Sequence, residues 1–498
     1  MSIINNIFGW ALKKRIHQID FFIKYPIDVQ NEVLSKLLDE AQNTEWGLKY
    51  DFKTIDCYQK FAERIPVSNY EQLYPEIERL LKGEKNILWP GAIDWFAKSS
   101  GTTNAASKFI PVTVASLEDC HYKGGKDMLS LYYHNFPQRE LFSGKSLSIG
   151  GTHQINPLNP KSNYGDVSAV IMQNLPLWAK AVRTPSLKVA LMDNWEDKLE
   201  AMVLECTNEN VTCMAGVPTW TLILLQKIIE REGKKNILEV WPNLELFVHG
   251  AVSFDPYKAI FKELIPSNKM NYQEVYNASE GFFGIQNDPK SDDLLLMLDY
   301  GVFYEFICMQ DQSKIIPLSE VELGKNYALI ITTNAGLWRY KIGDTVRFTS
   351  INPYKIKITG RTKHFINAFG EELMVSNSDI AIKYACENTN TTIKNYTAAP
   401  IYFEGNNRGG HEWLIEFDQN PSDLERFTYL LDNKLKEVNS DYEAKRYKDI
   451  ALSMPIVQAL PPDTFLRWLK SKNKLGGQFK VPRLCNDRVY IEEIKTFV

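Results

Sequence analysis

Cysteine is sparse in this sequence and follows no pattern. The seven cysteines include no Cys-x-x-Cys pair, and their number is odd. Such spacing argues against a disulfide framework and against a zinc site. Unpaired cysteines persist in a reducing compartment, so we expect a cytoplasmic protein.

Long hydrophobic runs and an excess of either charge are also missing. The longest apolar stretch falls far short of the roughly 20 residues that a membrane-spanning helix needs. Basic and acidic residues number 57 and 61, which gives a net charge of -4 and no reason to expect a nucleic-acid or membrane partner. With 44% hydrophobic and 24% charged residues, the composition is that of a folded protein with a sizeable core. It does not indicate an oligomeric state.

The residue patterns predict an α/β protein with a large N-terminal and a small C-terminal domain. Residues 1–90 are mainly helical in pattern, and short β-branched runs then alternate with helical runs up to residue 350. This alternation favours mixed β-sheets flanked by helices, whereas the last part of the chain indicates an α+β domain. We predict domains at 1–359 and 360–498 with a hinge near 360–363. The clearest predicted helices are 70–82, 219–231 and 424–438, and the clearest strands are 146–150, 244–250, 327–333 and 412–417, the last with a two-residue alternation.

A loop rich in hydroxyl groups is the first candidate site. Residues 98–108 read Lys-Ser-Ser-Gly-Thr-Thr-Asn-Ala-Ala-Ser-Lys. Backbone N–H groups and hydroxyls in such a loop suit phosphate oxygens, and a lysine adds positive charge. The glycines of a GxxxxGK[ST] phosphate loop are absent. An ordinary surface turn is an equally good interpretation of this segment alone.

A second candidate follows a predicted strand, where residues 275–281 read Val-Tyr-Asn-Ala-Ser-Glu-Gly. The carboxylate of Glu280 beside the hydroxyl of Ser279 suits a Mg²⁺ ion bound to phosphate oxygens. Tyr276 is suited to stack on a flat base. By itself, a strand-to-turn junction with an incidental acid is the better interpretation.

Three further segments carry charged residues next to glycine. Asp344 follows Gly343 and is suited to accept two ribose hydroxyls, although Gly-Asp pairs also form hairpin turns. Gly360 and Lys363 suit a hinge, with a plain linker as the alternative. A glycine-rich turn precedes Lys480, whose charge can offset the charge that builds at a phosphorus centre, or which belongs to a solvated basic loop.

The order of these segments resembles the adenylate-forming superfamily of acyl-CoA synthetases, firefly luciferase and peptide-synthetase adenylation domains. The resemblance narrows with Glu-Arg-Ile-Pro-Val at 63–67, Ser-Ser-Gly-Thr-Thr at 99–103 and Gly-Leu-Trp-Arg-Tyr at 336–340. Asn-Ala-Phe-Gly-Glu-Glu-Leu at 367–373 and Gly-Gln-Phe-Lys-Val-Pro-Arg at 477–483 complete it. These motifs resemble the Gretchen-Hagen-three family of auxin-responsive acyl-acid amido synthetases, its bacterial branch in particular, over nearly the whole chain.

The resemblance implies an ATP-dependent ligase of adenylate-forming fold with a mobile C-terminal domain. Such an enzyme adenylates a carboxylic acid to acyl-AMP and then transfers the acyl group to an amine, here an amino acid, with release of AMP. ATP and Mg²⁺ would be the cofactors, and a small carboxylic acid and an amine the partners. Two alternatives stay open: an acyl-CoA ligase with a thiol acceptor, and a non-catalytic protein that binds a nucleotide or acyl-AMP.

The resemblance also assigns roles to individual residues. Lys480 and Glu280 would be catalytic, Glu280 would hold the metal, and Lys363 would be the hinge residue. The nucleotide-binding residues would be Ser99, Ser100, Thr102, Thr103, Lys108, Gly250, Ala251, Tyr276, Ser279, Asp344 and Arg361. The acyl-binding residues would be Thr152, Val217, Pro218 and Trp220. Asn104-Ala105-Ala106 stands where the superfamily often has a glycine, which puts the role of Lys108 in doubt, and Trp220 is equally well interpreted as a core residue.

Overall fold

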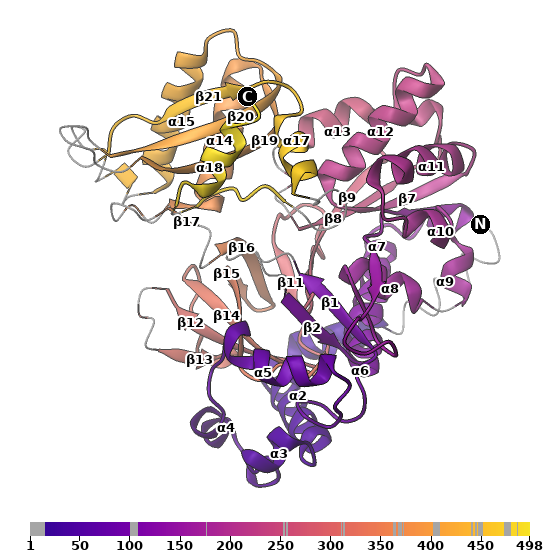
Figure 1. The fold of residues 1–498 in the computed structure, drawn as a ribbon, viewed down its shortest axis with the longest axis vertical. Helices are drawn as coiled ribbons and strands as arrows, with labels where there is room; N and C mark the ends of the chain where they lie inside the picture. The colour runs from indigo at the N-terminus through magenta and orange to yellow at the C-terminus, as the bar shows by residue number, and fades with distance from the viewer. Residues whose placement is uncertain are drawn as a thin grey trace. The chain divides into compact units, whose positions relative to one another are not determined.

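A computed structural model gives the fold of the chain (Figure 1). It describes residues 15–99, 108–175, 177–251, 254, 257–309, 311, 314–361, 365–366, 371, 373–401, 409–439, 442–443, 446, 452–472, 480–485 and 487–498.

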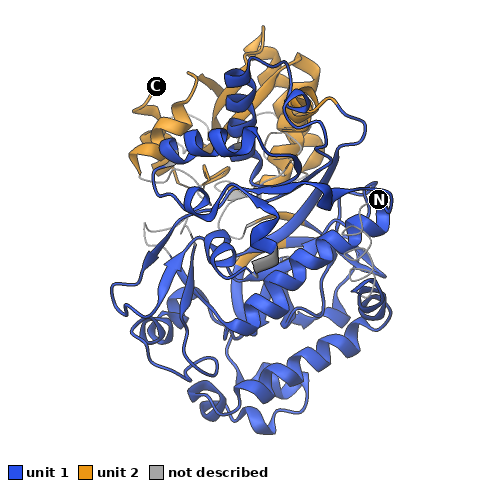
Figure 2. Ribbon diagram, turned by 90° about the vertical axis from the view of Figure 1, so that its right-hand side faces the viewer, with its two compact units in different colours: residues 1–251, 267–342, 346–357 blue, residues 252–266, 343–345, 358–498 orange. Residues whose placement is uncertain are grey.

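The chain divides into two compact units, which Figure 2 shows in blue and orange. The first comprises Met1–Ala251, Ser267–Ile342 and Val346–Lys357, and the second comprises Val252–Pro266, Gly343–Thr345 and Ile358–Val498. The second unit therefore includes two short segments that precede the predicted boundary at residue 360. The prediction of a mixed α/β fold with a separate C-terminal α+β domain is confirmed.

Short helices form the N-terminal part of the first unit. They are α2 (Pro26–Ala41), α3 (Glu45–Lys49), α4 (Tyr58–Arg64) and α5 (Tyr70–Leu81). Helix α5 begins with a capping box, in which Asn69 accepts from the N–H of Gln72 and Gln72 accepts from the N–H of Asn69. It ends before Gly83, whose φ of 94° is in the left-handed region that favours glycine.

Two sheets follow in the first unit. The smaller has four strands in the order β2-β1-β5-β4, and the larger has twelve in the order β13-β12-β14-β15-β16-β11-β10-β9-β8-β7-β3-β6. The strands of the small sheet are β1 (Trp95–Ser99), β2 (Lys108–Val112), β4 (His153–Ile155) and β5 (Asn163–Gly165). Those of the large sheet are β3 (Lys145–Ser148), β6 (Arg183–Thr184), β7 (Val211–Gly216), β8 (Leu246–Gly250), β9 (Asn271–Ala278), β10 (Gly281–Ile285), β11 (Leu294–Leu296), β12 (Val302–Cys308), β13 (Ile315–Pro317), β14 (Asn326–Thr333), β15 (Tyr340–Ile351) and β16 (Tyr354–Arg361).

The large sheet has a parallel part and an antiparallel part. Strands β6, β3, β7, β8 and β9 are parallel neighbours, and helices connect most of them. Strand β10 pairs antiparallel with β9 and β11, and β12 pairs antiparallel with β13 and β14. The connecting helices are α6 (Val114–Ser116), the π-helical segment η2 (Leu117–Tyr122), α7 (Lys123–Asn135), α8 (Val167–Gln173), α9 (Leu177–Ala181), α10 (Leu187–Ala190), α11 (Trp195–Thr207) and α12 (Pro218–Glu232).

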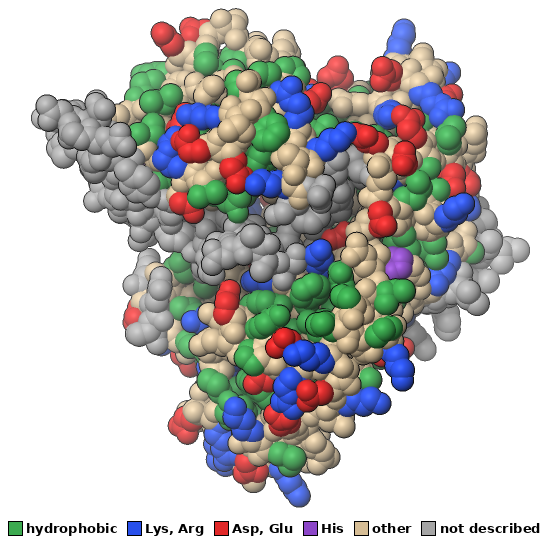
Figure 3. Space-filling view, viewed as in Figure 1, with side chains coloured by type: hydrophobic (Ala, Val, Ile, Leu, Met, Phe, Trp, Pro, Cys, Tyr) green, Lys and Arg blue, Asp and Glu red, His purple; other side chains and the backbone are tan. Residues whose placement is uncertain are grey.

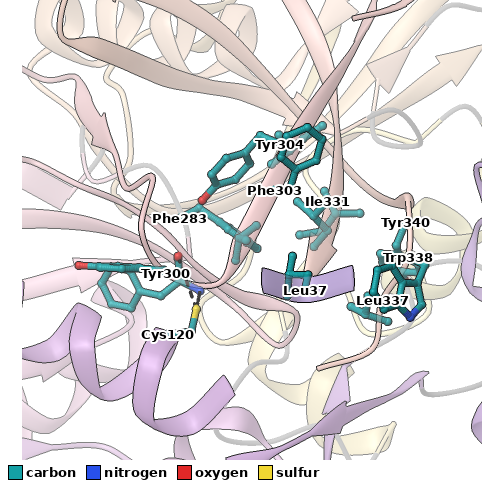
Figure 4. Packing of buried hydrophobic residues seen from close by; sticks show 14 of the residues in the cluster. Leu37, Cys120, Phe283, Tyr300, Phe303, Tyr304, Ile331, Leu337, Trp338 and Tyr340 are labelled. Carbon is teal, nitrogen blue, oxygen red and sulfur yellow. Dashed lines mark hydrogen bonds between the residues drawn. The ribbon is translucent and has the colours of Figure 1, made fainter. Parts of the chain in front are cut away.

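The main core lies between the N-terminal helices and the antiparallel part of the large sheet (Figure 4). Leu37 of α2 and Phe303 and Tyr304 of β12 belong to one continuous cluster with Trp338. The rings of Phe283 and Tyr304 meet edge to face with centroids 6.3 Å apart. Each fully buried large side chain contributes roughly 1.5–3 kcal/mol. This cluster therefore anchors the strands from which the parallel part extends.

The second unit is built on a three-stranded sheet of order β19-β20-β21. Glu412 and Glu416 are the polar positions of the alternation predicted for 412–417, but they are buried, not solvated. Glu412 pairs with Arg488 and Lys495, and Glu416 accepts from two backbone N–H groups at the start of α17. The elements of this unit are α13 (Lys258–Leu264), β17 (Phe365–Ile366), β18 (Leu373–Met374), α14 (Val375–Thr389), β19 (Thr392–Ile401), β20 (Gly410–Gln419), α15 (Leu424–Val438), β21 (Ile456–Leu460), α17 (Thr464–Ser471) and α18 (Val489–Lys495).

Charged side chains of both signs are interspersed over the face shown in Figure 3, as the balanced composition predicts. Within the described ranges, no helix combines the length and the apolar character that crossing a membrane requires.

Candidate active site

The carboxyl ends of four neighbouring parallel strands meet at one edge of the large sheet. Ser148 of β3 pairs with Ala215 of β7, and Gly216 of β7 pairs with His249 of β8. Gly250, at the end of β8, pairs with Val275 of β9. In α/β sheets such an edge is where ligands bind. Eight predicted residues, spread over more than a hundred positions of the sequence, lie at or shortly after the ends of these strands: Thr152, Val217, Pro218, Gly250, Ala251, Tyr276, Ser279 and Glu280.

The turn after β3 is held rigidly on all sides. The N–H of Gly151 donates to Ser168 at 3.0 Å, and the N–H of Thr152 donates to Oδ2 of Asp166 at 2.9 Å. From helix α11, Nζ of Lys198 donates to the carbonyls of Gly150 and Gly151 at 2.6 and 3.3 Å. A Cβ added to Gly151 would overlap the carboxylate of Asp166. The backbone at the predicted acyl-binding Thr152 is therefore fixed before any substrate arrives.

Two buried ionisable groups support this turn. Burial raises the pKa of Asp166, against the opposing effects of the Thr152 N–H and of Lys198. Burial also lowers the pKa of Lys198 to about 8, with Asp166 and Asp193 acting in the opposite direction. Neither residue carries a signal in the sequence, because a lysine in an amphipathic helix and an aspartate before a helix are ordinary.

The end of β7 continues directly into helix α12. Val217 is the N-cap and Pro218 occupies the first turn, where a proline costs no hydrogen bond. A Cβ on Gly216 would lie 3.7 Å from Ile149, so the ends of β3 and β7 are adjacent. Trp220 is buried in the first turn of α12. Its role in an acyl site stays a prediction.

The ends of β8 and β9 carry the predicted nucleotide-binding residues. Ala251 has a φ of 74°, an unusual left-handed conformation for a residue with a side chain. Tyr276 is buried, and its ring meets Phe283 edge to face at 4.9 Å. Ser279 and Glu280 form the turn into β10, and both are buried. A buried carboxylate at the carboxyl end of a strand is suited to bind a cation, but among the described residues no three His, Cys, Asp or Glu side chains converge as a metal site.

A histidine near this edge had no signal in the sequence. His121 lies in the π-helical segment η2, and such segments are frequent at functional sites. Burial lowers the pKa of His121 to about 4, although Asn277 acts to raise it. The side chains of His121 and Asn277 therefore lie close to each other in a buried environment. With this low pKa the imidazole is uncharged at neutral pH. A local sequence pattern does not predict a π-helical segment, which is why His121 is not indicated by the sequence.

Lys480 and Asp344 belong to the second unit. Asp344 is buried in β15, and Thr345 beside it bonds Thr359 through their hydroxyls at 2.9 Å. Lys480 is exposed, at the start of a segment pinned to β19. Arg483 in that segment stacks on the ring of Tyr396 at 4.5 Å, and its carbonyl accepts from Ala398. These contacts fix the backbone that follows Lys480 against strand β19.

Several predicted residues are only partly described. Ser100, Thr102, Thr103 and Lys363 lie outside the described residues. Ser99 ends β1 and Arg361 ends β16, with no description of either side chain. Lys108 opens β2 opposite Ser99, and its Nζ lies 5.6 Å from the centroid of the Tyr70 ring. The roles assigned to these residues stay predictions.

The chain is similar to known proteins over nearly its whole length. Family models match in three parts: the GH3 family N-terminal domain over residues 15–270, the central domain over 295–361 and the C-terminal domain over 376–489. The probable indole-3-acetic acid-amido synthetase GH3.1 of Arabidopsis thaliana is 23% identical, over 93% of this chain and 90% of that protein. The 4-substituted benzoates-glutamate ligase GH3.12 of the same plant is also 23% identical, over 94% and 95% of the two chains.

Solved structures share the fold. The GH3.15 acyl acid amido synthetase superposes with a TM-score of 0.80 at 16% identity, covering 97% of this chain and 96% of its own. A 2-hydroxyisobutyryl-CoA ligase in the postadenylation state superposes with a TM-score of 0.62 at 12% identity, covering 94% and 91%. The narrower prediction of a bacterial branch stays a prediction. Because the N-terminal family model alone matches more than half of the chain, the protein belongs to the GH3 family.

Proposed function

We propose that this protein activates a carboxylic acid as acyl-AMP at the expense of ATP and then passes the acyl group to the amine of an amino acid. Membership of the GH3 family supports the reaction class. The observation that carries the proposal is that β3, β7, β8 and β9 are neighbouring parallel strands, because Thr152, Pro218, Ala251 and Glu280 each follow the carboxyl end of one of them. An acid and a nucleotide bound along one edge lie close enough for their reactive groups to meet.

In the first step, a carboxylate oxygen of the acid attacks the α-phosphorus of ATP. An O–P bond forms, the bond to the β-phosphate oxygen breaks, and pyrophosphate leaves. When bound, Mg²⁺ would offset the charge that builds on the phosphate oxygens. Glu280 is the residue that we assign to hold it, and Lys480 the one that stabilises charge near the α-phosphate.

In the second step, the amine of the amino acid attacks the acyl carbonyl. A C–N bond forms, the bond between the acyl carbon and the AMP oxygen breaks, AMP leaves as the phosphate anion, and the proton of the amine passes to water. The anhydride is already activated, so no covalent enzyme intermediate is required. The rigid turn at Gly150–Thr152 fixes one wall for the acyl group while this attack takes place.

The first experiment is acid-dependent exchange of pyrophosphate into ATP in the presence of Mg²⁺. The acids are aryl, indolyl, jasmonate-like and fatty acids, and a reaction without acid is the control. Exchange with one class establishes adenylation and names the substrate class. Absence of exchange across the panel contradicts the proposal and favours a protein that binds nucleotide without turnover.

The acceptor is identified in a second experiment. With an acid that supports exchange, the twenty amino acids and coenzyme A are offered in parallel, and products are separated by mass. An amide conjugate formed without coenzyme A supports an amido synthetase. A thioester with no amide contradicts the second step and makes the protein an acyl-CoA ligase.

We place both steps in the cytoplasm because the cysteines lack a disulfide pattern.

A further inference from the structure

Arg183 of β6 is a buried cation for which the described residues provide no anionic partner. Its exposed fraction is 7%. Its Nη2 donates to the Sδ of Met172 at 3.3 Å, and a thioether is a weak acceptor. Its Nη1 is buried and has no hydrogen-bond partner among the described residues. Of the five donors of the guanidinium, the described residues therefore engage one through a weak bond to sulfur and leave those of Nη1 without an acceptor.

The surroundings of Arg183 supply no negative charge within the described part of the chain. Burial lowers the pKa of Arg183, and the only group acting to raise it is the thiol of Cys206. Burial raises the pKa of Cys206 itself to about 12, so that thiol is neutral. Taking an unpaired charge out of water is strongly unfavourable. Natural proteins depart from such rules mainly at functional sites, so a partner from outside the described chain is a physical reason for this charge.

Arg183 lies beside the predicted acyl site. Strand β6 pairs in parallel with β3, and Arg183 lies opposite Ser146 in that pairing. The Sδ of Met172, which Arg183 contacts, lies 2.7 Å from the position that a Cβ of Gly150 would occupy. Gly150 begins the rigid turn that carries Thr152. One sulfur atom therefore separates the guanidinium from the turn.

A second buried cation supports the same turn. Nζ of Lys198 is bonded to the carbonyls of Gly150 and Gly151, and no carboxylate bonds to it in the described chain. Lys198 donates its hydrogen bonds to the turn, whereas Nη1 of Arg183 makes no hydrogen bond with the described residues. Asp166 and Asp193 act electrostatically on Lys198, whereas no carboxylate of the described chain acts on Arg183, so the uncompensated positive charge on this side of the turn is that of Arg183.

We propose that Arg183 selects the acyl acid by pairing with a second anionic group of the substrate, so that the preferred acid is a dicarboxylate activated at one end only. This inference rests on the proposed function, because it assigns the substrate class of the same site. The carboxylate distant from ATP binds the guanidinium, which places the other carboxylate towards the nucleotide. Such a charge-assisted contact is formed with the substrate alone.

The test compares matched acids that differ only at the far end. The pairs are 4-methylbenzoic and terephthalic acid, 4-methylphenylacetic and 4-carboxyphenylacetic acid, and hexanoic and adipic acid, and in each pair a methyl group replaces the second carboxyl. Pyrophosphate exchange gives kcat/KM for each acid with the unchanged protein, Arg183→Met, Arg183→Lys and the matched surface control Arg231→Met. We expect a preference of roughly 10- to 100-fold for the diacid of at least one pair, which Arg183→Met abolishes. Arg183→Lys keeps part of the preference, and Arg231→Met keeps all of it.

Thermal unfolding without acid separates a selecting residue from a structural one. An unpaired buried cation is replaced at no loss by methionine, so Arg183→Met unfolds at the same or a higher temperature than the unchanged protein. A lower unfolding temperature overturns the proposal, as does an equal loss of exchange with both members of every pair. A preference for the uncharged acid in all pairs also overturns it.

Binding of the acids distinguishes this proposal from the proposed function. If no acid supports exchange, the adenylation proposal fails, and titration calorimetry with terephthalic and adipic acid decides the role of Arg183 alone. Binding of a diacid that Arg183→Met weakens roughly 10-fold or more supports the role. Absence of binding, or equal binding to the variant, rejects it.

Discussion

The guanidinium of Arg339 and the carboxylate of Glu305 form a buried, bidentate ion pair inside the first unit. Nε and Nη2 of Arg339 donate to the two carboxylate oxygens at 2.9 and 2.7 Å. Nη1 donates to the carbonyls of Ala62 and Ile65 at 2.6 and 2.8 Å. The arginine of the Gly-Leu-Trp-Arg-Tyr motif therefore joins the N-terminal helices to strand β12, and its role is to hold the fold together.

Removing one partner of this pair leaves a buried charge uncompensated. We expect Arg339→Met or Glu305→Leu to lower the free energy of unfolding by about 3–5 kcal/mol. The double variant has no orphaned charge, so its loss should be smaller than the sum of the two single losses. Urea denaturation of the three variants measures this coupling. Additive losses would contradict it, because they would mean that the two side chains act independently.

The pKa of Lys198 predicts how stability changes in alkaline solution. Burial lowers this pKa from its ordinary 10.5 to about 8. Between these values the unfolded chain binds more protons than the folded protein, so the free energy of unfolding rises with pH across that window. The rise attributable to Lys198 is at most about 3 kcal/mol.

The measurement is urea denaturation at pH 7, 8, 9 and 10. Other groups titrate in this range, so the slope of Lys198→Met is subtracted from that of the unchanged protein. The surface variant Lys227→Met is the control, since its partner Glu200 is solvent-exposed. A difference of zero or of negative sign would show that Lys198 is not held in a desolvated environment.

The local elements of this fold were predictable from sequence. The predicted helices 70–82, 219–231 and 424–438 are α5 (Tyr70–Leu81), α12 (Pro218–Glu232) and α15 (Leu424–Val438). Apolar spacing and capping residues act within one or two turns, which is why the boundaries agree so closely. The predicted strands at 244–250 and 327–333 likewise lie on β8 and β14 for most of their length.

The supporting residues of the candidate site were not predictable in this way. Arg183, Lys198 and His121 owe their burial to helices and strands that are far away in the sequence. Nothing in their own neighbourhoods distinguishes a buried basic residue from a solvated one. The strand alternation at 412–417 shows the same limit, because Glu412 and Glu416 contact residues of the helices near the end of the chain. Tertiary packing decided these positions.

Glu280 provides a test of the metal role. We expect Glu280→Gln to lower acid-dependent exchange by about 100-fold, because the neutral amide binds Mg²⁺ poorly. Raising the Mg²⁺ concentration should recover part of the loss, and the circular dichroism spectrum should not change. The isosteric control is Glu274→Gln, on the preceding strand β9. Equal Mg²⁺ dependence of Glu280→Gln and the unchanged protein would remove Glu280 from the metal site.

Lys480 separates the two half-reactions. Its charge is required where negative charge builds at the α-phosphate, and not where an amine attacks the acyl carbonyl. Lys480→Ala should therefore lower pyrophosphate exchange by roughly 100-fold or more while nucleotide affinity falls less than about 10-fold. Conjugation of a supplied acyl-AMP to an amino acid should proceed at its normal rate. Lys472→Ala is the control, since Lys472 pairs with Glu493 on the surface at 2.8 Å. An equal loss of nucleotide binding and exchange would show that Lys480 acts in binding alone, and a parallel loss of the second step would show that its role is structural.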